Sequence, residues 1–242
     1  MKDSVVWFSE RLERDLRVSR WGHWGTPVLL FPTAGGDADE VERMGVIAAV
    51  WPLIEAGRVK LYSVDSVAGR AWIEGGHSTE YCCLLQNRFD ECMYREVVPH
   101  IRRDCRSETV EIVTAGASLG AFNAVSSMCR HPDVFAAAIG MSGTYDYSRF
   151  CHDGFTMDLF YSSPLHYLPG LGDGEQLHLL RQRFALLTYV GGRWEDPEET
   201  WRMAGVLGSK QVPNRVVGWG SEYDHDWPAW RAMLPIYLDE ML

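Results

Sequence analysis

The stretch Gly116-Ala117-Ser118-Leu119-Gly120 decides the fold of this chain, because of the residues on each side of it. The β-branched run over 110–115 predicts a buried strand, and residues 121–130 predict a helix that ends before a His-Pro pair. A serine in a G-x-S-x-G pattern between a strand and a helix predicts a sharp turn that lifts its side chain out of the sheet. The glycines let the backbones pass closely, and the helix directs its positive N-terminal end at the serine. We therefore predict that Ser118 is a nucleophile.

Length and composition favour a single soluble α/β domain over residues 1–242. The chain is 46% hydrophobic and 23% charged, which is ordinary for a globular protein of this size. A formal net charge of -10 argues against nucleic acid or an anionic membrane as a partner. We find no apolar run of membrane-spanning length and no signal-peptide pattern at the N-terminus. Six cysteines without CxxC or zinc spacing predict free thiols, no metal site and a cytoplasmic location.

Hydrophobic periodicity predicts strands first and then an alternation of strands and helices. The predicted strands cover 5–8, 15–21, 28–31, 59–65, 110–115, 135–141, 184–190 and 215–218. The predicted helices cover 39–56 with an interruption at Pro52, 86–103 with a kink at Pro99, 121–130, 200–208 and 227–242. This order implies a mostly parallel sheet with helices on both faces and an active site at the carboxyl ends of the strands. The segment 145–180 breaks the alternation, and we expect it to form a small cap over that site; a plain surface excursion is the alternative.

A serine nucleophile needs a base and an acid that orients the base, and after this kind of turn they follow in the order Ser, acid, His. His225 lies between the last predicted strand and the last helix, where the base belongs. The acid should follow the preceding strand, where the loop and helix start hold four carboxylates. Glu198 and Glu199 suit the first turn of the next helix. We therefore predict Asp196 as the acid, with Glu195 as the alternative.

Two backbone N–H groups should stabilise the oxyanion of a tetrahedral intermediate. One should come from Leu119, the residue after the nucleophile. The other should come from the loop Pro32-Thr33-Ala34-Gly35-Gly36, which follows a buried strand and has small residues that allow a close approach. We predict Ala34 as this donor, with Gly35 as the alternative.

Five segments, at 31–36, 116–121, 130–132, 192–197 and 225–228, occur in an order that resembles the putative esterase family. That family is similar to esterase D (S-formylglutathione hydrolase), the feruloyl esterases and the mycolyltransferases of the antigen 85 type. The resemblance extends from about Trp7 to Leu238 and implies an α/β-hydrolase fold, a Ser-His-acid mechanism and no cofactor. Relatives commonly have His-Gly where this chain has Pro32-Thr33, so the oxyanion loop departs from the pattern. The position of the acid also varies among them, which makes Glu199 a third candidate.

These observations together predict a cytoplasmic serine hydrolase that cleaves small-molecule carboxylic esters. Ser118 would attack the acyl carbonyl, His225 would act as base and then as acid, and Asp196 would hold the imidazole. Two alternatives are an acyltransferase that uses the same residues and a hydrolase-like scaffold protein without activity. The sequence does not determine the oligomeric state.

Overall fold

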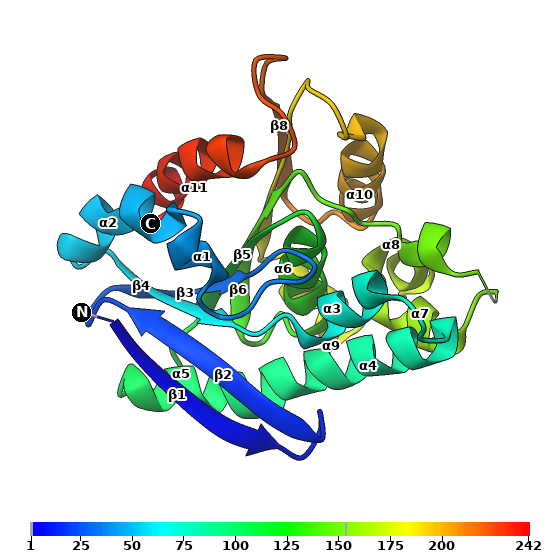
Figure 1. Cartoon of the computed structure of the whole chain (residues 1–242). Helices are drawn as coiled ribbons and strands as arrows, with labels where there is room; N and C mark the ends of the chain where they lie inside the picture. The colour runs from blue at the N-terminus through cyan, green and yellow to red at the C-terminus, as the bar shows by residue number, and fades with distance from the viewer. Residues whose placement is uncertain (1, 153) are drawn as a thin grey trace.

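The structure is a computed structural model that describes residues 2–152 and 154–242. One eight-stranded sheet forms its centre, in the order β1-β2-β4-β3-β5-β6-β7-β8 (Figure 1). Strands β1 and β2 form an antiparallel hairpin, β2 is antiparallel to β4, and all other neighbours are parallel. The strands are β1 (Lys2–Ser9), β2 (Arg14–Trp21), β3 (Thr26–Phe31), β4 (Val59–Val64), β5 (Ile112–Ala117), β6 (Phe135–Met141), β7 (Phe184–Tyr189) and β8 (Asn214–Gly218). The predicted mostly parallel α/β sheet is confirmed.

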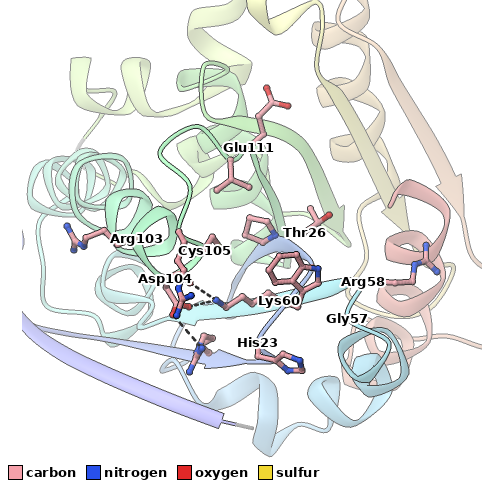
Figure 2. A pocket seen from close by; sticks show the side chains of 15 residues that line it. His23, Thr26, Gly57, Arg58, Lys60, Arg103, Asp104, Cys105 and Glu111 are labelled. Atoms are coloured by element: carbon pink, nitrogen blue, oxygen red, sulfur yellow. Dashed lines mark hydrogen bonds and ion pairs between the residues drawn. The ribbon is translucent and has the colours of Figure 1, made fainter.

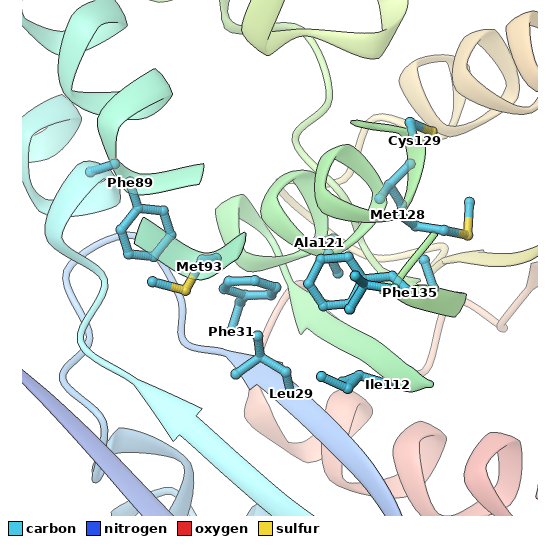
Figure 3. Close-up of a cluster of buried hydrophobic side chains, with 14 of the residues drawn as sticks. Leu29, Phe31, Phe89, Met93, Ile112, Ala121, Met128, Cys129 and Phe135 are labelled. Atoms are coloured by element: carbon cyan, nitrogen blue, oxygen red, sulfur yellow. The ribbon is translucent and has the colours of Figure 1, made fainter. Parts of the chain in front are cut away.

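Helices cover both faces of the sheet because the central strands are apolar on both sides. On one face, α2 and α11 bury Val50, Ile54 and Leu234 against the sheet. On the other face, α4, α5, α6 and α10 surround a larger cluster, part of which is shown in Figure 3 around Phe31, Phe89 and other labelled side chains. The main helices are α1 (Glu40–Arg43), α2 (Val46–Glu55), α3 (Val67–Glu74), α4 (Thr79–Cys92), α5 (Val98–Asp104), α6 (Leu119–Arg130), α10 (Pro197–Ser209) and α11 (Trp227–Met241).

Two of the predicted helices differ in detail from the observed ones. The helix expected over 39–56 is divided at Gly45, whose φ of 77° ends the first helix, and Pro52 lies inside α2. The helix expected over 86–103 begins earlier, at Thr79, because the Ser78 hydroxyl caps it by accepting from the N–H of Tyr81 (3.2 Å). A π-helical turn, η1 (Met93–Val97), interrupts it before the expected kink at Pro99. Helix α3 was not predicted.

The segment after β6 contains short helices rather than one long element. They are η2 (Tyr147–Phe150), α7 (Met157–Ser162), α8 (Pro164–Tyr167), η3 (Leu168–Gly170) and α9 (Glu175–Leu180), and residue 153 of this segment lies outside the described residues. Helix α7 packs on α4, while α8 packs on α6 and α10. These contacts place the segment on the helical layer that covers one face of the sheet. Its role as a cap stays a prediction.

Candidate active site

Ser118 occupies a sharp turn between β5 and α6, as the sequence predicted. Its φ of 56° and ψ of -122° are an uncommon conformation for a residue with a side chain. The N–H of Ser118 donates to the carbonyl of Met141 (3.0 Å), and its carbonyl accepts from the N–H groups of Thr144 (3.1 Å) and Ala121 (3.1 Å). These three bonds hold the strained backbone in place and leave the half-buried serine side chain at the carboxyl end of the strand.

The two glycines of the motif make this turn sterically feasible. A Cβ at Gly116 would overlap the carbonyl oxygen of Gly120. A Cβ at Gly120 would lie 2.5 Å from the carbonyl oxygens of both Phe31 and Pro32. The start of α6 therefore touches the backbone that leaves β3, which brings the loop over 32–36 beside Ser118.

The imidazole of His225 pairs with Glu195 and not with the predicted Asp196. Nδ1 of His225 lies 3.0 Å from Oε2 of Glu195, whose side chain is 3% exposed. Asp196 is exposed and accepts a hydrogen bond from the N–H of Glu198 (3.1 Å), which makes it the N-cap of α10. The expectation for Asp196 is corrected for this reason: its carboxylate serves the helix start, whereas the alternative, Glu195, turns inward to the histidine.

The loop that carries Glu195 is fastened to the loop that carries His225. Asp224, the neighbour of His225, accepts a hydrogen bond from the N–H of Arg193 (2.8 Å). Gly192 has no room for a Cβ beside the backbone of Tyr223 and Asp224. Trp194 then adopts a φ of 64° with its side chain 90% exposed. This outward turn of Trp194 lets the following glutamate point into the protein.

The indole of Trp230 contacts His225 and faces a small cavity near the end of β5. Its ring lies 5.2 Å from the imidazole of His225 at 85°, an edge-to-face contact. Trp230 also lines a small cavity together with Thr33 and Ala117, the residue before the nucleophile.

Leu119 and Ala34, the predicted oxyanion donors, belong to one small apolar cluster. It contains Cys83, Leu119, Phe122, Tyr147 and Leu159, with Ala34 packed against it. Leu119 is the first residue of α6, so its N–H has no partner within the helix. Within residues 2–152 and 154–242, the N–H groups of Leu119 and Ala34 make no backbone hydrogen bond. Neither N–H is thus committed to a backbone carbonyl within these residues.

Glu199, the third candidate for the acid, has a different task. Its buried carboxylate accepts from the N–H of Asp146 and lies 3.2 Å from the guanidinium of Arg149. Burial raises the pKa of Glu199, although these two partners favour its ionised form. Glu199 therefore fastens the loop after β6, which itself donates to the Ser118 carbonyl through Thr144.

A wide cavity of about 940 Å³ lies elsewhere, at the amino ends of the strands (Figure 2). Its floor holds Lys60, whose ammonium lies 2.8 Å from Asp104, and Asp104 also accepts from Tyr62 (2.6 Å). Lys60 and Asp104 thus form an ion pair, and the cavity lies at the end of the sheet opposite Ser118. Among the described residues, no His, Cys, Asp and Glu side chains are grouped in a way that could hold a metal ion.

Comparison with known proteins finds similarity both in sequence and in fold. A family model described as "Putative esterase" matches residues 84–240. The chain is similar in structure to a ferulic acid esterase, with a TM-score of 0.74 and 15% identity over 100% of this chain and 99% of that chain. It is also similar to the S-formylglutathione hydrolase of Staphylococcus aureus (TM-score 0.65, 14% identity, 100% of this chain and 96% of that one).

A third similar structure is a fluorophosphonate-binding serine hydrolase of Staphylococcus aureus (TM-score 0.66, 14% identity, 100% of this chain and 98% of that one). At such identities the likeness is one of fold, and it confirms the predicted α/β-hydrolase architecture. A search of functionally curated proteins gives no match. None of the helices in the described part of the chain is long and apolar enough to span a membrane.

Proposed function

The chain belongs to the putative esterase family and is a carboxylic ester hydrolase, and we propose that it works through an acyl-enzyme formed on Ser118. The observation that carries this proposal is the hydrogen bond between His225 and the buried Glu195; Trp230, whose ring contacts His225, also lines a small cavity with Ala117, the residue before Ser118. A nucleophile, a base and an orienting acid thus come from the ends of three different strands.

In the proposed reaction, Ser118 Oγ attacks the acyl carbonyl of the ester while Nε2 of His225 takes the serine proton. The tetrahedral intermediate collapses when the imidazolium gives that proton to the departing alcohol. Water then attacks the acyl-enzyme with His225 again as base, and the carboxylic acid leaves as Ser118 recovers its proton. Glu195 accepts a hydrogen bond from the Nδ1–H throughout, which fixes the tautomer and stabilises the imidazolium.

The N–H groups of Leu119 and Ala34 would donate hydrogen bonds to the oxyanion of the tetrahedral intermediates in acylation and deacylation. Each such donor typically contributes about 10²–10³ in kcat. The helix dipole of α6 adds to this stabilisation because Leu119 stands at its N-terminus. This part of the proposal is supported by the shared apolar cluster and by the absence of another backbone partner for either N–H within the described residues.

Residues 1–242 are proposed to act as one domain in the cytoplasm, on small-molecule esters. All six cysteines are free, and five of them, Cys82, Cys83, Cys92, Cys129 and Cys151, have raised thiol pKa values because burial disfavours the thiolate. Thiols of this kind suit a reducing compartment.

The proposal is tested by labelling the purified protein with a fluorophosphonate probe and by measuring hydrolysis of p-nitrophenyl acetate. Wild-type protein should be labelled and active, whereas Ser118→Ala and His225→Ala should show neither activity nor labelling while keeping the wild-type circular dichroism. Added alcohols should give no ester product, which separates hydrolysis from acyl transfer. Folded wild-type protein that does not react with the probe would contradict the proposal.

A further inference from the structure

The loop after β3 is tied to a carboxylate from the next helix. Glu40, the first residue of α1, accepts from the N–H of Thr33 at 2.8 Å. It also accepts from the hydroxyl of the same threonine, whose Oγ1 lies 2.9 and 3.0 Å from its two oxygens. Both donors of Thr33 are therefore committed to one side chain, and a Cβ at Gly36 would overlap that carboxylate.

The same loop contains a turn that fixes the direction of the next peptide group. The N–H of Gly36 donates to the carbonyl of Thr33 (3.2 Å), so Ala34 and Gly35 are the central residues of a four-residue turn. In a trans peptide the C=O and N–H bonds point in opposite directions. Because the Thr33 carbonyl points into the turn, the N–H of Ala34 points out of it.

Ser66 holds the far side of the turn. Its hydroxyl donates to the carbonyl of Ala34 (3.3 Å), and its N–H donates to the carbonyl of Gly36 (2.9 Å). The peptide plane that carries the Ala34 N–H is thus fixed from both ends: Ser66 restrains its C-terminal neighbour, and Glu40 restrains Thr33 on the N-terminal side.

We propose that Glu40 is a positioning residue of the oxyanion hole, which acts through Thr33 to aim the N–H of Ala34 at the tetrahedral oxyanion. This inference rests on the proposed function. Glu40 does not touch the reacting atoms, and its negative charge opposes the charge of the oxyanion, so its contribution lies in geometry alone. A glutamine, which keeps a carbonyl acceptor for Thr33 and loses the charge, should therefore replace Glu40 well, whereas alanine should not.

The test compares Glu40→Ala, Glu40→Gln and Thr33→Val with wild-type protein in hydrolysis of p-nitrophenyl acetate. We expect kcat to fall by about 30- to 300-fold in Glu40→Ala with a small change in KM, since the loss of one oxyanion donor costs about 10²–10³. The kcat of Thr33→Val should lie between those of Glu40→Ala and wild-type protein, and the kcat of Glu40→Gln should stay within about 10-fold of wild type. Glu42→Ala is the control, because Glu42 lies in the same helix but bonds Trp21 and Lys2 instead.

A readout specific to the oxyanion is the affinity for an aryl trifluoromethyl ketone, which forms a tetrahedral adduct on the serine. Its inhibition constant should rise in proportion to the loss of kcat/KM across the variants. A folded Glu40→Ala protein with wild-type kcat, or with ketone affinity unchanged while kcat falls, would overturn the inference and leave the proposed function intact. Wild-type protein with neither labelling nor turnover would overturn both.

Discussion

His225 and Glu195 form a hydrogen-bonded pair across 30 residues of chain, with Nδ1 of the histidine 3.0 Å from Oε2 of the glutamate. The glutamate side chain is almost fully buried, while the aspartate that follows it faces solvent and caps α10. A buried carboxylate beside an imidazole orients the ring and stabilises its protonated form, which an exposed one does less well. The two adjacent acids therefore have separate roles that substitution can distinguish.

Glu195→Gln should lower kcat strongly and Asp196→Asn should not. The amide at 195 can donate a hydrogen bond to Nδ1 and so favour the tautomer that carries its proton on Nε2. We expect kcat to fall by a factor of about 10²–10⁴ for this reason. Steady-state kinetics on p-nitrophenyl acetate measures the effect.

Asp196→Ala provides the matched comparison. It removes the cap of α10 and should lower the unfolding free energy by about 0.5–2 kcal/mol with kcat nearly unchanged. If Asp196→Asn lost more activity than Glu195→Gln, the assignment of the acid would be wrong.

Gly120→Ala should destabilise the protein and impair the nucleophile turn. The new methyl group would lie 2.5 Å from the carbonyl oxygens of Phe31 and Pro32, so either α6 or the oxyanion loop must move. Overpacking of this kind typically costs about 1–3 kcal/mol, and we expect the urea midpoint and kcat to fall together.

Gly205→Ala is the control for that substitution. Gly205 lies in the exposed interior of α10, and nothing lies within 4 Å of a Cβ there. Alanine should raise the unfolding free energy by about 0.5–1 kcal/mol and leave kcat unchanged. A Gly120→Ala protein as stable and active as Gly205→Ala would contradict the steric account of the turn.

Asp224→Ala should reduce kcat without removing any group of the proposed triad. Its carboxylate accepts from the N–H of Arg193 and so joins the loop of Glu195 to that of His225. Without this bond the acid loop is less restrained, and we expect a loss of about 10-fold in kcat, in line with the effect of small misplacements at catalytic groups. Asp226→Ala, which removes only the cap of α11, should affect the melting temperature more than kcat. Equal kinetic effects of the two substitutions would argue against this role of Asp224.

The sequence predicted the features that depend on local patterns. The strand–serine–helix turn and the order of the main strands follow from residue spacing and chain order, and the described structure confirms both. The role of His225 as the base follows from chain order alone and stays a prediction. Gly45 was missed as the end of a helix because the apolar periodicity continues on both sides of it, although its φ of 77° divides α1 from α2. Such a break depends on backbone conformation that a hydrophobic pattern does not encode.

The choice between Glu195 and Asp196 was beyond the sequence for a related reason. Both are acids at the same loop, and the one that turns inward is decided by the positive φ of Trp194 and by the Asp224–Arg193 contact between loops. The Glu40–Thr33 contact was missed as well, since the two residues are seven positions apart and the turn that ends at Gly36 brings their side chains together. Contacts made by folded loops leave no periodic signal.

Stability should decline below neutral pH through two partly buried histidines. Burial lowers the pKa of His100 and of His166 below the ordinary value of 6.5; at His100 the carboxylate of Asp104 opposes this shift, while Arg103 and Arg20 add to it. The unfolded chain therefore binds more protons than the folded one as pH falls from about 6.5, so the unfolding free energy decreases there and is constant with respect to these groups above it.

Urea unfolding between pH 8 and pH 5 measures this dependence. Below pH 6.5, His100→Gln should reduce the slope of the unfolding free energy against pH by less than about 1.4 kcal/mol per pH unit, the limit for one proton. Adding His166→Gln should reduce this slope further. Above pH 7 the difference between each variant and wild-type protein should not change with pH, which serves as the internal control. If His100→Gln kept the full wild-type slope, burial of this imidazole beside Trp7 would not be a source of acid sensitivity.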